Sequence, residues 1–273
     1  MNGFERLRRI LSEFESCAVA YSGGADSAFL ADVAHEMLGA ERCVAVTAVS
    51  ESLAPAERKA AALLARERGW RHVEIATREI DRDEYRANAP DRCYHCKTEL
   101  FERLDELGGS LGVETILVGT NLDDTGDFRP GQRAARERGV RAPLLEAGLG
   151  KDEIRALSRD RGLPTWDKPA SACLASRIAY GIEVTAERLD RVARAEALLR
   201  SMGVRELRVR DHGDLARIEV PPDEIARLAS SPAREQLAEG LAALGFVYVT
   251  LDLAGFASGS MNRALLRIEP IRG

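Results

Sequence analysis

The chain has 273 residues, 45% of them hydrophobic, and a formal net charge of −5 from 44 acidic and 39 basic residues. This length suffices for one large domain or two modest ones, each with a buried core. The acidic balance argues against a broad nucleic-acid-binding surface. No apolar run approaches the roughly 20 residues that span a bilayer, and the N-terminus lacks the apolar segment of a signal peptide. We therefore expect a cytoplasmic protein that contacts no membrane and binds no nucleic acid.

The first half of the sequence alternates strand-like and helix-like segments. Apolar, strand-like runs cover residues 17–20, 43–49, 72–76 and 115–119. Segments with helical spacing or propensity lie before, between or after them, at residues 4–14, 28–38, 55–68, 97–107 and 150–161. This alternation predicts a parallel sheet covered on both faces, with ligands beyond the C-terminal ends of the strands. We therefore expect an α/β domain over residues 1–175.

The pattern changes in the second half. A long amphipathic helix is predicted over residues 185–202, and residues 207–220 read as a β-hairpin with its turn at 211–214. Two short helices flank Pro232, and a last strand covers 246–252. These elements predict a smaller α+β domain over residues 176–273.

A glycine-rich turn lies between the first predicted strand and its helix, where residues 20–27 read Ala-Tyr-Ser-Gly-Gly-Ala-Asp-Ser. Backbone N–H groups at a helix N-terminus attract anions, and the helix dipole strengthens the attraction. Gly23 and Gly24 let the backbone approach a phosphate without a Cβ clash. The candidate ATP-binding residues are therefore Ser22, Gly23, Gly24, Asp26 and Ser27.

This turn differs from a Walker loop, because no Lys follows the glycines and Asp26 stands where the helix begins. A carboxylate beside phosphates suggests a bridging Mg²⁺, which prefers oxygen ligands. The interpretation is a site that grips the pyrophosphate part of ATP. The alternative is a tight turn in which Ser22 or Asp26 caps the helix.

Polar residues also follow other predicted strands. Thr47 lies near the end of the second strand, and Gly119, Asn121 and Asp124 follow the fourth. In a parallel sheet these strand ends lie along one edge with the glycine-rich turn. We expect Gly119 to permit close approach, Asn121 to offer hydrogen bonds and Asp124 to help hold Mg²⁺, whereas a capped turn with solvated acids is the alternative.

The five cysteines fall into two groups. Cys17 and Cys43 begin apolar runs and are predicted core residues. Cys93 and Cys96 form a CxxC, which is typical of redox, zinc and iron–sulfur sites alike. No second CxxC completes a Cys₄ zinc site, and Cys173 is the one further cysteine outside the predicted core. Three thiolates fit a [4Fe–4S] cluster with one open iron, and three unrelated thiols are the alternative.

The predicted hairpin carries a group of charged residues. Arg208 and Arg210 share one face of their strand, because side chains alternate along it, and Glu219 lies on the partner strand. Two guanidinium groups there suit a phosphate or carboxylate, whereas a solvated polar sheet face is the commoner explanation for such a pattern. Trp166 is suited to stack on an aromatic substrate or to pack at a domain junction.

Several segments resemble known families. SGGADS at 22–27 resembles the PP-loop signature SGGxDS of the ATP pyrophosphatases, which cleave ATP between the α- and β-phosphates and transfer AMP to a carboxylate or carbonyl oxygen. That turn, together with GTNLDD and DFRPG at 119–131, KPASACLASRI at 168–178 and RVRDHGDLARIEV at 208–220, resembles the LarE family. Its members are ATP-dependent sulfur transferases that make the nickel-pincer nucleotide cofactor of lactate racemase.

The resemblance implies a PP-loop ATP pyrophosphatase domain, followed by an α+β domain for substrate binding and oligomerisation. The implied enzyme adenylylates the carboxylates of pyridinium-3,5-biscarboxylic acid mononucleotide and converts them to thiocarboxylates. The resemblance also implies ATP and Mg²⁺ as cofactors, and catalytic roles for Asp26, Cys173 and Arg177. Arg177, Arg208 and Arg210 would contact substrate phosphate or carboxylate, and Trp166 and Glu219 are further substrate-binding candidates.

The family implies two sources of sulfur. Members with only the cysteine that matches Cys173 sacrifice its sulfur, whereas members with three cysteines bind a [4Fe–4S] cluster thought to carry an extra sulfide. Cys93, Cys96 and Cys173 make this chain similar to the cluster type. The implied partners are other copies of the chain in a homo-oligomer and a sulfide or sulfur-donor protein.

Three other functions are compatible with the sequence. A tRNA thiolase of the PP-loop superfamily is disfavoured by the acidic net charge and by the lack of an evident RNA-binding domain. An amide-forming PP-loop ligase would not need three cysteines. A non-catalytic nucleotide- or zinc-binding module would release no pyrophosphate.

Overall fold

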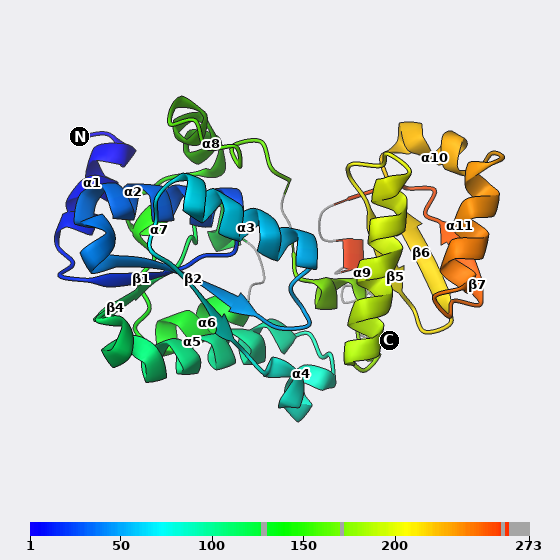
Figure 1. Ribbon diagram of the computed structural model, residues 1–273, viewed down its shortest axis with the longest axis horizontal. Coiled ribbons are helices and arrows are strands. Elements are labelled where there is room, and N and C mark those ends of the chain that lie inside the picture. Colours follow the sequence, from blue (N-terminus) through cyan, green and yellow to red (C-terminus); the bar gives the residue numbers. More distant parts are fainter. Residues whose placement is uncertain (127–129, 170–171, 258–259, 262–273) are drawn as a thin grey trace, which may run out of the picture. The chain divides into compact units, whose positions relative to one another are not determined.

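The computed structural model describes residues 1–126, 130–169, 172–257 and 260–261. Within these residues the chain forms two compact units, shown in Figure 1. The first unit comprises residues 1–79 and 93–171, and the second comprises residues 80–92 and the chain from residue 172 onward. The sequence pattern divided the chain only near residue 175 and did not separate the segment 80–92 from its surroundings.

The first unit contains a parallel sheet, as predicted. Its four strands are β1 (Cys17–Ala20), β2 (Cys43–Val49), β3 (His72–Ala76) and β4 (Thr115–Leu117), in the order β3-β2-β1-β4. All three pairings are parallel. The predicted core positions of Cys17 and Cys43 are confirmed, since these residues are partners in the β1–β2 register and both are fully buried.

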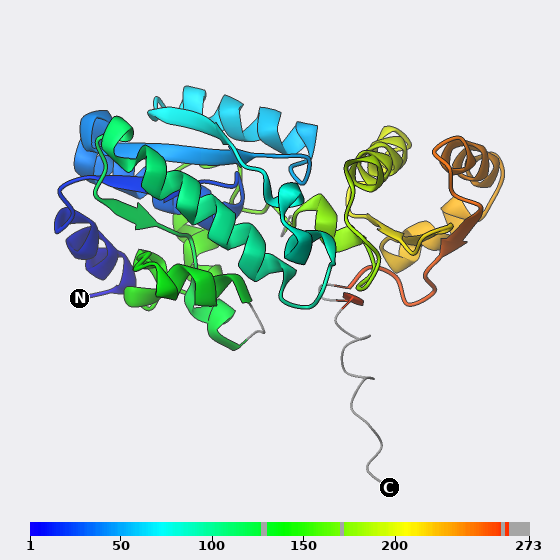
Figure 2. The same cartoon turned by 90° about the horizontal axis from the view of Figure 1, so that it is seen from below.

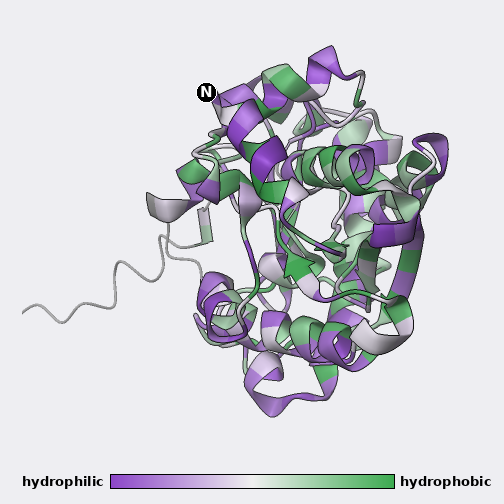
Figure 3. Ribbon diagram, turned by 90° about the vertical axis from the view of Figure 1, so that its left-hand side faces the viewer, coloured by the Kyte–Doolittle hydropathy of each residue, from purple (hydrophilic) through white to green (hydrophobic). Residues whose placement is uncertain are grey.

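Helices cover both faces of this sheet (Figure 1). One face packs against α1 (Gly3–Ser12), α2 (Ala25–Arg42), α3 (Pro55–Glu67), α7 (Pro143–Glu146) and α8 (Lys151–Asp160). The other face packs against α5 (Arg92–Leu111) and α6 (Pro130–Glu137), and in Figure 2 α5 crosses the near face of the sheet. The helices are banded in polar and apolar colours in Figure 3, as expected of helices with one buried side.

Helix α5 begins at Arg92, five residues earlier than the predicted start at Lys97. The chain turns just before it, where the Arg92 N–H donates to the Ala89 carbonyl (3.0 Å). The helix is anchored further along by Leu100, Phe101 and Leu104, which are buried against the sheet. The earlier start places the CxxC inside the helix rather than in a loop.

The second unit has a three-stranded sheet in the order β5-β6-β7. Strands β5 (Arg208–Asp211) and β6 (Leu215–Glu219) form the predicted antiparallel hairpin, and β7 (Tyr248–Leu251) pairs in parallel with β6. Helices α9 (Ala186–Ser201), α10 (Pro222–Leu228) and α11 (Ala233–Ala242) contribute to its apolar core. The short helix α4 (Asp83–Arg86) also belongs to this unit.

Asn88, on the segment after α4, explains why residues 80–92 join the second unit. Its backbone has a φ of 54°, a left-handed conformation that Asn tolerates better than most residues. Its buried side-chain amide donates to the carbonyls of Ala179 and Ile182, both at 2.9 Å. No helix in the described part of the chain is long and apolar enough to cross a membrane.

Candidate functional site

The glycine-rich turn connects β1 to α2 and is braced by its own hydroxyl groups. Ser27 Oγ lies 3.1 Å from Ser22 Oγ and donates to the Gly24 carbonyl at 3.2 Å. Gly23 has a φ of 73°, and a Cβ there would lie 3.0 Å from the Cβ of Ala61 on α3. The turn therefore needs glycine at position 23 both for its backbone conformation and for its contact with α3.

Helix α2 starts directly after this turn with Gly24 as its N-cap, and no side chain caps it. The alternative prediction, that Ser22 or Asp26 serves as the cap, therefore does not describe this structure. The first N–H groups of a helix have no partner within the helix, and together with the dipole they favour a bound anion. The turn thus keeps the geometry that a phosphate group requires.

Gly119, just beyond β4, lies against the first turn of α2. A Cβ at this position would be 2.9 Å from the Ser27 backbone nitrogen and 3.1 Å from the Asp26 carbonyl carbon. Real Cβ atoms almost never approach backbone atoms so closely. Glycine at position 119 therefore permits a close approach to the start of helix α2, and its contact with a nucleotide stays a prediction.

A pair of acidic residues follows the ends of β1 and β4. Burial raises the pKa of Asp26 above its usual value, and the nearby carboxylate of Asp124 raises it further, while Lys151, Asn121 and Arg155 act in the opposite direction. Asp124 is 4% exposed, and its Oδ1 lies 3.4 Å from Lys151 Nζ. Two neighbouring carboxylates in a partly desolvated position are a suitable environment for a divalent cation.

The loop after β4 is held in place by short polar contacts. The Asn121 N–H donates to Asp124 Oδ2 (3.2 Å), and the Asp123 N–H donates to Asn121 Oδ1 (3.0 Å). Asp123 Oδ2 also accepts the N–H of Lys151 (2.6 Å) at the start of α8. The structure thus brings the predicted residues Asp26, Asn121 and Asp124 together and adds Lys151.

Thr47 is placed differently from these residues. Its side chain is 2% exposed, its hydroxyl donates to the Tyr21 carbonyl (2.9 Å), and its Oγ1 lies 2.8 Å from His72 Nε2. The hydroxyl thus supports the end of strand β1. Its contact with a nucleotide stays a prediction.

Sequence reasoning missed two lysines near the turn. Lys151 was recognised only as part of a helix, although Lys after Gly at a helix start is a local signal that would have indicated it. Lys168 contacts the Gly23 carbonyl from 145 residues away, a relation that no local pattern indicates.

Trp166 is 38% exposed, and the Arg159 guanidinium lies 5.7 Å from its ring centroid. Its stacking on a substrate stays a prediction.

In the second unit, Cys173 precedes a short 3₁₀ turn over Leu174–Arg177 and is exposed. Its carbonyl accepts hydrogen bonds from the Ser176 N–H and hydroxyl (3.0 and 2.7 Å) and from Arg177 Nη1 (3.0 Å). Arg177 is itself 2% exposed and paired with Glu196. Arg177 therefore fixes the main chain that carries Cys173, and its predicted contact with substrate stays a prediction.

The charged residues of the hairpin differ in their surroundings. Arg210 is buried and donates to Glu219 Oε2 (2.7 Å) and Ser260 Oγ (2.9 Å), so these two residues pair in the interior, and their contact with substrate stays a prediction. Burial lowers the pKa of Arg208 to about 10, with a further contribution from the neighbouring guanidinium of Arg177. Arg208 is thus a half-buried cation near both Arg177 and Glu196, and its contact with substrate stays a prediction.

Cys93 and Cys96 lie in the first turns of α5, where residues three apart share one side of the helix. Cys93 is exposed and Cys96 is half-buried. Among the residues that the structure describes, no three His, Cys, Asp or Glu side chains are grouped so that they could hold a metal ion. The two cysteines of the CxxC belong to the first unit and Cys173 to the second, so the three-cysteine ligand set stays a prediction.

Contacts within the second unit connect the chain beside these cysteines. The Arg92 guanidinium is buried and donates to the Ala175 carbonyl (2.7 Å). Arg92 immediately precedes Cys93, and Ala175 follows Cys173 by two residues. The residue before the CxxC and the turn after Cys173 are therefore held together.

The first unit is a parallel α/β fold with a glycine-rich turn and paired carboxylates at its strand ends, the general layout of α/β proteins that bind ligands at this edge. No protein-family model matches the chain. A relative from Lactiplantibacillus plantarum, named pyridinium-3,5-bisthiocarboxylic acid mononucleotide synthase, is 37% identical over 95% of this chain and 93% of that protein. The chain therefore belongs to the family of that synthase, the LarE family.

Two further relatives carry no functional name. An uncharacterized protein of Synechocystis is 45% identical over 96% of this chain and 98% of its own length. An uncharacterized protein of Methanocaldococcus jannaschii is 29% identical over 63% of this chain and 66% of its own length. The resemblance seen in the motifs thus extends over nearly the whole chain.

Proposed function

We propose that this chain is an ATP-dependent sulfur transferase that converts the carboxylates of pyridinium-3,5-biscarboxylic acid mononucleotide to thiocarboxylates for a nickel-pincer cofactor. The relative of Lactiplantibacillus plantarum is named for the bisthiocarboxylic acid product, and its match over 95% of the chain is the observation that carries the proposal. In each round ATP transfers AMP to a carboxylate and releases pyrophosphate. A sulfur nucleophile then displaces AMP and leaves a thiocarboxylate.

The geometry of the β1–α2 turn supports a role in binding ATP. Gly23 and Gly24 lead into the uncapped N-terminus of α2, and Gly119 lets that N-terminus approach β4. Backbone N–H groups in this position stabilise negative charge on a departing pyrophosphate.

The donor set beside the turn fits Mg²⁺. Asp26 and Asp124 are hard oxygen ligands, and burial together with the nearby Asp124 carboxylate raises the pKa of Asp26. These two residues would hold the ion, which would neutralise phosphate charge. Lys151 pairs with Asp124 and moderates the same repulsion.

The second unit supplies a candidate site for the anionic substrate. Arg208 is half-buried, and its pKa is lowered by burial and by the charge of Arg177, while Glu196 acts in the opposite direction. A phosphate or carboxylate of the pyridinium mononucleotide would stabilise this cation. Arg210, on the same strand as Arg208, forms a buried pair with Glu219 on β6, and this pair would support the anion site.

The sulfur step would depend on Cys93, Cys96 and Cys173. Three thiolates match the ligand number of a [4Fe–4S] cluster with one open iron, and all three residues are exposed or half-buried. When bound, the cluster would supply sulfide at its open iron.

The activity is tested with purified protein, MgATP, sulfide and the biscarboxylate mononucleotide. We expect pyrophosphate release that depends on the mononucleotide, and a product whose mass shows oxygen replaced by sulfur. Asp26→Asn should abolish both signals, whereas Asp190→Asn, on the exposed side of α9, should preserve them. Pyrophosphate release that requires tRNA instead would identify a tRNA thiolase, and its absence with every acceptor would indicate a non-catalytic module.

The source of sulfur is tested separately by anaerobic purification with iron, sulfide and zinc analysis. Iron and acid-labile sulfide should be lost in Cys93→Ser, Cys96→Ser and Cys173→Ser variants alike. Stoichiometric zinc without iron would contradict the cluster. A mass loss of H₂S at Cys173 after turnover would show that this residue is sacrificed.

A further inference from the structure

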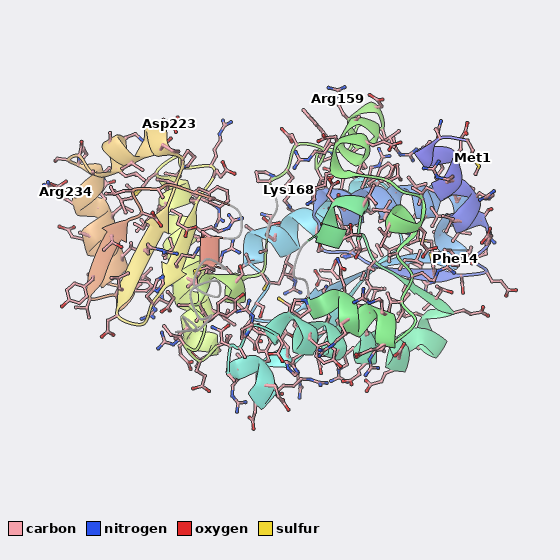
Figure 4. All side chains as sticks on the ribbon, turned by 180° about the vertical axis from the view of Figure 1, so that it is seen from behind. Met1, Phe14, Arg159, Lys168, Asp223 and Arg234 are labelled. Atoms are coloured by element: carbon pink, nitrogen blue, oxygen red, sulfur yellow. The ribbon has the colours of Figure 1, made fainter. Side chains whose placement is uncertain are left out.

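Lys168 lies in the segment that follows α8 and is labelled in Figure 4 beside helix α3. Its Nζ donates to the Gly23 carbonyl (2.9 Å) and to Glu57 Oε2 (2.6 Å) in the first turn of α3. Both side chains are partly buried, at 21% exposed for Lys168 and 27% for Glu57. The ammonium group is therefore held at one peptide of the glycine-rich turn by a carboxylate of the same unit.

The main chain of Lys168 is also fixed. Its N–H donates to the Thr165 carbonyl (3.1 Å), and its own carbonyl accepts from Arg155 Nη2 on α8 (3.2 Å). A residue held at its N–H, its carbonyl and its side-chain terminus has little freedom to choose another position. This arrangement differs from that of a surface lysine, whose long side chain retains its rotamer entropy.

The peptide that Lys168 contacts joins Gly23 to Gly24. In a trans peptide the carbonyl oxygen and the N–H point to opposite sides of the chain. A peptide between two glycines can flip at little steric cost, because neither residue has a Cβ. The Gly24 N–H donates to Ser22 Oγ over a long distance of 3.4 Å. A flip would turn this N–H to the opposite side and replace the donor with a carbonyl oxygen, which repels phosphate.

We propose that Lys168 is a positioning residue that locks the Gly23–Gly24 peptide with its N–H directed away from Lys168, on the side of Ser22 Oγ, where the ATP phosphates would bind. This proposal rests on the proposed ATP site and assigns a role to a residue outside the glycine-rich sequence. A charge-assisted hydrogen bond to the carbonyl also polarises the peptide and strengthens its N–H as a donor. Glu57 keeps the ammonium group at the carbonyl and prevents it from moving to solvent.

The test compares the binding of a non-hydrolysable ATP analogue and of AMP, both with Mg²⁺, to the full-length protein. Lys168→Met should weaken the binding of the ATP analogue by about tenfold, the range expected for loss of a charge-assisted hydrogen bond. The same change should affect the binding of AMP much less. Lys168→Arg should restore most of the affinity, because a guanidinium can donate to both Gly23 and Glu57. Lys59→Met, an exposed lysine on the same helix as Glu57, is the matched control and should bind like the wild type.

Glu57→Gln provides a second variant in case Lys168→Met unfolds. It keeps a hydrogen-bond acceptor for Lys168 and removes the charge, so a smaller loss in the same direction is expected. If the wild type and Lys168→Met bind the analogue with the same affinity, the positioning role is overturned. A complex in which Lys168 Nζ leaves the Gly23 carbonyl and contacts a phosphate would also overturn it. Failure of the wild type to bind the analogue would instead overturn the proposed ATP site itself.

Discussion

Arg177 and Glu196 form an ion pair with almost no access to solvent. Arg177 Nε lies 2.9 Å from Glu196 Oε1, and the two side chains are 2% and 1% exposed. Arg177 also donates to the carbonyls of Ala172 and Cys173. The pair therefore connects helix α9 to the main chain at Cys173, so the thiol is carried by a segment with a defined position within its unit.

Replacing Glu196 with Ala should destabilise the protein strongly. The change leaves the Arg177 cation buried without its carboxylate, for which a loss of about 3–5 kcal/mol is expected. Asp190→Ala breaks the exposed pair between Asp190 and Arg194 on the same helix and should cost at most about 0.5 kcal/mol. Urea unfolding measures both values, and equal losses would contradict the importance of the buried pair.

The same pair should shape the stability of the protein in acid. Burial alone would raise the pKa of Glu196, but the neighbouring guanidinium of Arg177, aided by Arg200 and Arg208, lowers it below its ordinary value of 4.5. A carboxyl with a lowered pKa contributes stability above its unfolded pKa, and this contribution is lost as the pH falls through the folded value. Glu196→Gln should therefore flatten the decline in the free energy of unfolding below about pH 4.5, and an unchanged slope would contradict the assignment.

Asp26→Asn should raise stability while removing activity. Burial and the charge of Asp124 raise the pKa of Asp26, so its ionised form is unfavourable in the protein without a bound cation. The amide removes this repulsion, and a gain on the order of 1 kcal/mol is expected without nucleotide. Thermal unfolding without Mg²⁺ checks the gain, and pyrophosphate release checks the loss. A destabilised but active variant would show that Asp26 serves the fold instead.

Gly119→Ala should disturb the start of α2. The added Cβ would lie 2.9 Å from the Ser27 nitrogen, and neither backbone can yield cheaply. We expect a loss of about 1–3 kcal/mol from overpacking and weaker binding of ATP. Gly109→Ala is the matched control, because its added Cβ on helix α5 meets nothing within 4 Å, and it should be neutral or stabilising by about 0.5–1 kcal/mol. Similar effects of the two changes would contradict the close approach.

Arg208→Met should weaken binding of the mononucleotide by about ten- to a hundredfold without a matching loss of stability. Burial and the neighbouring Arg177 already disfavour this cation, whose pKa is lowered to about 10. Because the group is charged only below that value, wild-type affinity should also fall as the pH rises through about 10. Arg205→Met, an exposed arginine just before the same strand, should change neither property. Affinity that stays constant through pH 10 would argue against Arg208 as the anion contact.

The sequence by itself determined the elements that depend on short-range signals. The four parallel strands appear as apolar runs between helical segments, the hairpin of β5 and β6 was visible from alternation around a polar turn, and Gly23 and Gly119 were identified because glycine permits close backbone approach. These signals are local, since burial and backbone conformation constrain residue type at each position. The start of α5 was placed five residues late, because Arg92 enters the helix through a turn fixed by its surroundings.

Only the tertiary structure decided which distant residues share a contact. Asn88 joins residues 80–92 to the second unit through carbonyls about 90 positions away, and Lys168 reaches Gly23 across 145 positions. The Thr47 hydroxyl donates to the Tyr21 carbonyl. The Arg177 guanidinium pairs with Glu196 and donates to the Cys173 carbonyl. A polar side chain has the same local pattern whether it meets a ligand or another part of the chain, because its partner is set by how the elements pack.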